Sequence, residues 1–244
     1  MTRPLALDED HHVHSSFSDD AVSTVAQNVA AARRRGLRIV VLADHVRQDT
    51  AWLPEFQAAV DALRPVPGLE IRAGVEAKIL DQSGALDLPP GAASAERVLI
   101  ADHQFPGERG PVHPRQMRDA LEAGEVSADE VISGLVQATA AALTMAARPQ
   151  LAHLFSLLPK MGLAEADVPD QAIAHLARQA RQAGARVEVN EKWACPSART
   201  VAVFADAGVR LVASTDSHYC ADVGSYASVR ELAGAVFGAG QPGR

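Results

Sequence analysis

Short apolar runs alternate with longer amphipathic stretches along this chain, and seven of the runs have the length of β-strands. These runs are β-branched or continuously apolar, which is typical of parallel strands covered on both faces. The seven predicted strands lie within Leu5–Val13, Arg38–Ala43, Leu69–Val75, Arg97–Ala101, Gln150–Leu154, Ala185–Asn190 and Val209–Ser214.

Helical patterns lie between these strands, and several end at a glycine, a common residue just past a helix. The predicted helices span Val22–Arg35, Ser127–Ala147, Asp170–Ala183, Ala198–Ala207 and Tyr226–Phe237. Gly84–Gly91 and Phe105–Pro114 are rich in Gly and Pro and are predicted to be loops. The alternation of strand and helix predicts a parallel sheet with right-handed crossovers, either a closed barrel or a doubly wound sheet.

No linker, repeat or low-complexity tract divides the 244 residues, so we expect one domain over residues 1–244 with a frayed end at Gly238–Arg244. Met1–Asp10 lacks the apolar segment of a secretory signal. No apolar run reaches the roughly 18 residues of a membrane span, so no membrane is expected as a partner. Cys195 and Cys220 form no CxxC motif, and this sparse usage favours a reducing cytoplasm.

The composition and the net charge favour some classes of binding partner over others. Hydrophobic residues make up 48% and charged residues 22%, as in ordinary globular proteins. The formal net charge of −7 opposes binding to nucleic acid, because a phosphate backbone is bound by a basic track. It does not oppose a small phosphorylated substrate, whose charge cations can meet at one spot.

Six of the nine histidines fall at or just past the ends of predicted strands. Glu76 follows the third strand and Asp216 follows the seventh. Because the carboxyl ends of parallel strands face one side of the molecule, these side chains should converge. The six histidines are His12, His14, His45, His103, His153 and His218.

Such a cluster is unfavourable to bury unless cations compensate it. The HxH of His12 and His14 points two imidazoles the same way, because strand side chains alternate. Imidazole and carboxylate ligands suit zinc, manganese or iron, and this set is too large for one ion. We therefore expect two or three divalent ions, two of them joined by a bridging carboxylate.

The other three histidines have different surroundings. His11 should face away from His12 and is predicted to be structural. His113 lies in a Pro-flanked loop and His175 in a helix, where both are predicted to face solvent. His113 is the one of the two that would approach the mouth of the site.

The segments around these residues resemble the PHP superfamily, named for polymerase and histidinol phosphatase. The matching segments follow the family's order over nearly the whole chain: DHHVHSSFSDDA, LADH, GVEAK, IADHQ, LAHLF, VEVN and STDSH. The resemblance implies a distorted (β/α)7 TIM-like barrel with two or three metal ions. It further implies a phosphoric ester hydrolase, similar to stand-alone histidinol phosphatases.

The resemblance also implies a ligand set. The first metal would be held by His12, His14, Glu76 and Asp216; the second by Glu76, His103 and His153; the third by Asp20, His45 and His218. Asp20 lies six residues after His14, where the family has His or Asp, and Asp19 is the neighbouring alternative. Asp102 stands where the family often has a small residue, and it would either orient an imidazole or act as a cap.

The expected mechanism is in-line attack on phosphorus by a hydroxide that bridges two of the ions, with Asp216, His218 and Glu76 as catalytic residues. Candidate cations for the substrate phosphate are Lys78, Arg109, Arg115, Lys160 and Lys192. Lys192 and Arg109 are favoured because they follow strand ends closely.

Several alternatives remain open. The substrate would be histidinol phosphate or another small ester such as a nucleotide or sugar phosphate, whereas a PHP-type phosphodiesterase or nuclease is disfavoured by the net charge. An amidohydrolase-type barrel also begins with HxH, but it typically has a metal-bridging Lys at the fourth strand end, where this chain has Asp102 and His103. A non-enzymatic metal-binding or regulatory domain would bind metal without turnover.

Overall fold

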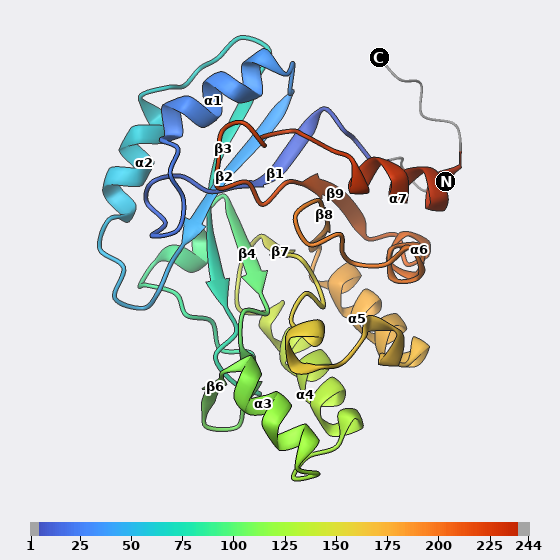
Figure 1. Ribbon diagram of the computed structural model, residues 1–244. Helices are drawn as coiled ribbons and strands as arrows, with labels where there is room; N and C mark the ends of the chain where they lie inside the picture. Colours follow the sequence, from blue (N-terminus) through green and yellow to red (C-terminus); the bar gives the residue numbers. More distant parts are fainter. Residues whose placement is uncertain (1–4, 239–244) are drawn as a thin grey trace.

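The computed structural model describes residues 5–238, in which seven parallel strands form one sheet in the order β1-β2-β3-β4-β7-β8-β9. The strands are β1 (Glu9–Val13), β2 (Ile39–His45), β3 (Glu70–Lys78), β4 (Arg97–Ala101), β7 (Pro149–Leu151), β8 (Arg186–Asn190) and β9 (Arg210–Ser214). Strands β1 and β9 lie close together, and just past their ends the His14 N–H donates to the Ser217 carbonyl at 2.9 Å. The sheet is therefore a nearly closed barrel (Figure 1).

All seven predicted strands are present, and the barrel is confirmed over the doubly wound sheet. Strands β2 and β3 extend beyond their predicted ends, so that His45 and Glu76 lie within strands. Strand β7 is shorter than predicted and ends two residues before His153. The predicted frayed segment beyond Gly238 lies outside the described residues, as do residues 1–4.

Within residues 5–238, six α-helices lie between strands and a seventh follows the last strand. They are α1 (Val25–Arg34), α2 (Leu53–Asp61), α3 (Pro114–Glu122), α4 (Ala128–Ala142), α5 (Asp170–Gln182), α6 (Ala198–Asp206) and α7 (Ser228–Phe237). Short 3-10 turns occupy Ala92–Ser94, Leu158–Met161 and Glu165–Asp167. Among residues 5–238, no helix combines the length and apolarity needed to cross a membrane.

Two parts of the sequence prediction were wrong. The segment Phe105–Pro114 is not a plain loop, because it contains an antiparallel hairpin of β5 (Phe105–Gly107) and β6 (Gly110–Val112). Helices α2 and α3 were not predicted. Helix α3 begins at Pro114, which the first turn of a helix tolerates, and the His113 side chain caps it by accepting the Arg115 N–H.

The helices cover the outside of the barrel, and the inside holds small and polar side chains. Apolar residues of α1 and α2 pack on β1–β3, those of α4 and α5 on β3–β8, and those of α6 and α7 on β8 and β9. Inside, Ala43, Leu99, Ala101 and Ala152 form a small separate cluster. Because side chains alternate along each strand, residues two apart from these also face the barrel axis.

Candidate metal centre

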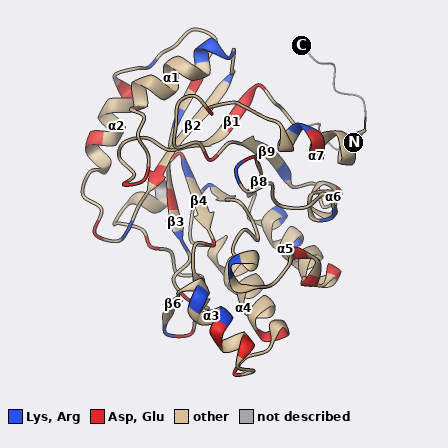
Figure 2. Cartoon of the chain, in the orientation of Figure 1, with Lys and Arg blue, Asp and Glu red and all other residues tan. Residues whose placement is uncertain are grey.

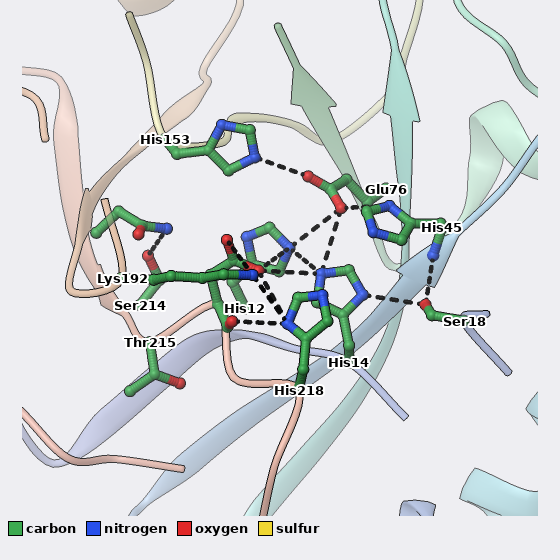
Figure 3. Close-up of polar contacts among 12 residues, drawn as sticks. His12, His14, Ser18, His45, Glu76, His153, Lys192, Ser214, Thr215 and His218 are labelled. Atoms are coloured by element: carbon green, nitrogen blue, oxygen red, sulfur yellow. Dashed lines mark hydrogen bonds and ion pairs between the residues drawn. The ribbon is translucent and has the colours of Figure 1, made fainter. Parts of the chain in front are cut away.

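The buried carboxylate of Glu76, on β3, is the centre of the histidine cluster (Figure 3). Its Oε2 lies 3.4 Å from His12 Nε2, 3.3 Å from His14 Nε2 and 2.8 Å from His45 Nδ1. No hydrogen bond of acceptable geometry reaches this oxygen among the described residues. His12 Nε2 and His14 Nε2 also face each other at 2.9 Å. Several lone pairs therefore converge on one small volume.

The other oxygen of Glu76 contacts two histidines that follow strands β4 and β7. Glu76 Oε1 lies 3.3 Å from His103 Nε2 and 3.0 Å from His153 Nε2. The second nitrogen of His153 lies 3.4 Å from Asp102 Oδ1, and the Ser156 hydroxyl donates to the same carboxylate. Of the two roles considered for Asp102, the geometry fits orientation of an imidazole, that of His153.

Asp216 and Asp20 complete the ring of acids. Asp216 Oδ1 lies 3.2 Å from His14 Nε2, and Asp216 Oδ2 accepts the indole N–H of Trp193 at 2.8 Å. Asp20 Oδ2 lies 3.1 Å from His218 Nε2 and 3.5 Å from His45 Nε2. Both Asp20 and its neighbour Asp19 are exposed, but Asp19 pairs with Arg47 and contacts none of these histidines. All nine residues proposed as ligands thus gather at the carboxyl ends of the strands.

Two buried acids that sequence reasoning left without a role support the cluster from behind. Glu188, on β8, lies 3.0 Å from His12 Nδ1 and accepts hydrogen bonds from Gln150 and Ser214. Asp44, on β2, accepts from Ser15 and from the Ser18 hydroxyl, which in turn contacts His14 Nδ1 at 3.1 Å. An acid inside an otherwise apolar strand was the available signal, in LADH and in VEVN.

The pKa values show how strongly these groups interact. Burial by itself would raise the pKa of Glu76, but the imidazoles of His12, His103 and His45 outweigh it and hold that pKa well below its ordinary value. Burial by itself would lower the pKa of His153, yet its contacts with Asp102 and Glu76 raise it to about 10. The Glu76 carboxylate is therefore ionised, with its charge stabilised by the neighbouring imidazoles.

The backbone is strained at two of the ligands. His153 has a φ of 29° and Asp216 a φ of 51°, a left-handed conformation that non-glycine residues rarely adopt. Such conformations cost on the order of 1–3 kcal/mol and persist where surrounding structure enforces them. Each lies two residues past the end of a barrel strand, β7 or β9, and its side chain reaches the cluster.

The donor set fits divalent metal ions. Three overlapping groups of residues each bring ligand atoms within 4.8 Å of one another. The groups are His12, His14 and Asp216; His45, Glu76 and His103; and His14, His45 and His218. The unsatisfied Oε2 of Glu76 and the facing nitrogens of His12 and His14 are explained if cations lie between them.

A cavity of about 240 Å³ opens beside the cluster, lined by residues that include Asp20, Glu76, Lys78 and His103. Lys78 Nζ lies 3.4 Å from Asp87, on the cavity wall. The structure thus places one predicted cation against the cavity.

Two further cations lie on the Trp193 side of the cluster. Lys192 Nζ lies 3.6 Å from Asp216 Oδ2 and 3.2 Å from His218 Nδ1. Lys160 Nζ lies 4.1 Å from the centre of the Trp193 ring. Arg109 and Arg115 are exposed, and no side-chain contact joins either of them to the cluster within residues 5–238.

The three remaining histidines lie apart from the cluster. His11 pairs with Glu9 at 2.6 Å and contacts Arg186 at 3.2 Å, so its imidazole lies with the charged groups near the strand starts and not with the metal-centre residues. His113 and His175 are exposed, as predicted. Cys195 and Cys220 are both free thiols.

A parallel α/β barrel with imidazoles and carboxylates gathered at its carboxyl pole defines the class of this protein. The PHP domain family model matches residues 10–190, which is most of the chain. The chain therefore belongs to the PHP domain family, as the segments quoted above suggested.

Curated relatives match over part of their length. The chain is 34% identical over 94 residues to a probable phosphatase of Thermoanaerobacter sp. (strain X514), covering 38% of each protein. It is 32% identical over 124 residues to a probable phosphatase of Shewanella sediminis (strain HAW-EB3), covering 48% of this chain and 50% of the relative. The chain spans about half the length of these relatives or less.

A solved structure shares the fold. It is histidinol phosphate phosphatase from Lactococcus lactis, in complex with zinc, L-histidinol and phosphate. The TM-score is 0.65, the sequence identity is 14%, and the match covers 95% of this chain and 93% of that one. The likeness shows the barrel architecture over almost the whole chain.

Proposed function

We propose that this protein is a metal-dependent phosphoric monoester hydrolase that acts on a small phosphorylated metabolite. One observation carries the proposal: the two oxygens of a single buried carboxylate, Glu76, are shared among five imidazoles that come from the ends of four strands. A bridging carboxylate between adjacent cations has this arrangement. The phosphatases among the relatives, and the phosphate bound by the structural neighbour, support the same chemistry.

The residues would divide among two or three ions as the family resemblance implies. His12, His14 and Asp216 would hold one ion with Glu76, and His103 and His153 would hold the second through the other oxygen of Glu76. Asp20, His45 and His218 would hold a third. When bound, divalent ions neutralise phosphate charge and lower the pKa of water. Zinc, manganese and iron all suit this donor set.

The chain's own residues would position the ester. Lys192, next to Asp216 and His218, is the cation best placed to meet a phosphate oxygen, and Lys78 lies on the cavity wall. Lys160 over Trp193 would place a second positive charge on the Lys192 side. Arg109 and Arg115 would need a change in the β5–β6 hairpin or α3 to reach a substrate, so we assign them no contact.

A small substrate is favoured over a nucleic acid. The formal net charge of −7 would repel a polyanionic backbone. Acidic and basic residues are also interspersed over α3 and α5, rather than sorted into a basic track (Figure 2). Family membership favours phosphoester chemistry over an amidohydrolase-type reaction.

The test is a panel of phosphate esters assayed with manganese, iron and zinc in turn, beside metal analysis of the purified chain. We expect at least two transition-metal equivalents per chain and turnover of small monoesters, histidinol phosphate among them. Turnover confined to diesters or oligonucleotides would identify a phosphodiesterase instead. Tight metal binding without turnover of any ester would contradict the enzyme and support a binding domain.

A further inference from the structure

The amino ends of the barrel strands, opposite the metal centre, carry a second cluster of charged residues. Arg72, Arg97, Arg186 and Arg210 lie at or near the starts of β3, β4, β8 and β9. We call these four residues the arginine cluster.

The side chains of the arginine cluster face the barrel axis. Arg186 lies two residues before Glu188, whose carboxylate contacts His12 and Gln150 inside the barrel. Arg97 lies two residues before Leu99, a member of the small interior cluster. The same alternation places Arg72 on the face of Glu76 and Arg210 on that of Ser214, because each pair is four residues apart. Four guanidinium groups therefore share the amino end of one barrel.

Acids compensate only half of this charge. Arg72 pairs with Glu70 at 2.6 Å, and Arg210 lies 3.5 Å from Glu9, a carboxylate that Arg38 also contacts. Within residues 5–238, Arg97 and Arg186 have no carboxylate partner, although only 6% and 8% of their surface is exposed.

The hydrogen-bond partners of these two buried residues are not acids. Arg97 donates to the carbonyl of Arg148 at 3.3 Å, and its buried Nε has no hydrogen-bond partner within residues 5–238. Arg186 contacts Nδ1 of His11 at 3.2 Å. Burial and the neighbouring arginines lower the pKa of Arg97 to about 10 and that of Arg186 to about 9. Guanidinium groups stay protonated near pH 7 at these values. The acid that acts on Arg186 is Glu9, which already contacts Arg38, Arg210 and His11, so the buried positive charge is only partly compensated.

We propose that the arginine cluster is a binding site for a small multivalent oxyanion of the phosphate type, separate from the metal centre. Planar guanidinium groups match tetrahedral oxyanions through paired N–H donors. An anion there would partner the free Nε of Arg97 and neutralise the charge that Glu9 and Glu70 leave over. This site does not depend on the function proposed for the opposite pole.

A chain of polar contacts joins the site to the metal centre. Arg186 contacts His11, the carbonyl of His11 accepts from Gln150, and Gln150 donates to Glu188, which lies 3.0 Å from His12. Every step lies within the barrel interior. An anion that fixes the position of Arg186 would therefore affect the position of the Glu188 carboxylate, which orients His12.

The experiment measures thermal unfolding of the full chain in low-millimolar phosphate against sodium chloride of equal ionic strength. Phosphate at about 100 times its Kd should raise the Tm by about 5–10 °C, because it binds the folded state alone. Asp216→Asn should keep this shift, because Asp216 lies at the other pole. Arg97→Met and Arg186→Met should lose it, whereas Arg34→Met, an exposed change on α1, should keep it.

The proposal is overturned if phosphate stabilises the wild-type chain no more than chloride does, or if the arginine variants keep the full shift. It is also overturned if Asp216→Asn alone abolishes the shift, which would place the anion at the metal centre. Should Arg97→Met and Arg186→Met not fold, Arg210→Gln, at a half-exposed position, decides the same question. Its shift should be clearly smaller than that of the wild type.

Discussion

The two ends of this barrel have opposite electrostatic requirements. At the carboxyl end, Glu76 and Asp216 are buried beside imidazoles and need cations. At the amino end, Arg97 and Arg186 are buried without a carboxylate contact within residues 5–238, which favours an anion there. Both ends face the same interior, where Gln150 and Glu188 separate them. The polar interior of this barrel therefore has an excess of acidic groups at one end and of basic groups at the other. Each excess indicates a ligand of opposite charge.

Removal of a metal ligand should have the largest effect. We expect Asp216→Ala and His14→Ala each to lower phosphatase activity by more than about 100-fold, since even residues behind metal ligands are worth 10–100-fold. Steady-state hydrolysis of a small aryl phosphate, with circular dichroism to check folding, measures this. His175→Ala, an exposed change on α5, is the matched control. Wild-type activity in either variant would show that the residues at the carboxyl end of the barrel are not the catalytic site.

Removal of the metal should destabilise the whole fold. Chelation with EDTA leaves the carboxylates of Glu76 and Asp216 without their counter-charge, and we expect the Tm to fall by about 5–10 °C. Differential scanning fluorimetry before and after chelation, and again after metal is restored, tests this. Arg210→Gln, at the amino end, should show the same fall. An unchanged Tm would mean that the cluster is stable without cations.

A support residue should have a smaller effect than a ligand. Glu188→Gln weakens the acceptor beside His12 Nδ1, and we expect a loss of about 10–100-fold in metal affinity with a parallel loss of activity. Titration of activity against added metal separates the two losses, because excess metal should restore most of the rate. Glu191→Gln removes a buttress of the α7 amino end instead and should leave metal affinity unaltered. Equal metal affinity in the two variants would show that Glu188 does not support His12 as a metal ligand.

The smallest effect concerns the acid at the amino end. Burial alone would raise the pKa of Glu9, but His11, Arg38 and Arg210 lower it from 4.5 to about 2. Because the folded-state pKa is depressed, this contribution to stability is complete above pH 4.5 and is lost as the pH falls towards 2. Urea unfolding of wild type and Glu9→Gln at several pH values should show a stability difference that shrinks across this window. A difference that stays constant would show that Glu9 does not hold its charge in this way.

The positions of the seven strands along the chain were predictable because their signals are local, although the exact ends of β2, β3 and β7 were not. The continuous apolar run before His45 and the glycine before Val209–Ser214 both report structure within a few residues. Helix α3 escaped prediction because its start, PVHPR, has the composition of a turn, and only the His113 cap distinguishes it. The β5–β6 hairpin escaped for the same reason, since Gly and Pro dominate both of its strands.

The gathering of the candidate ligands was also predictable, because a strand end is a position in sequence as well as in space. His12, Glu76 and Asp216 could be assigned to one pole from strand order alone. Their supporting groups could not. Asp44 and Glu188 resemble any other strand acid until Ser18 and His12 are seen beside them.

The sequence by itself determined that seven strands alternate with helices and that imidazoles and acids follow the strand ends, because both patterns are written in neighbouring residues. Only the tertiary structure decided which oxygen of Glu76 meets which imidazole, and that Arg97 and Arg186 share one buried end of the barrel. Those contacts join residues as many as 175 positions apart, as between Arg186 and His11. These residues come together only when the barrel closes, so no pattern among neighbouring residues in the sequence could predict their contacts.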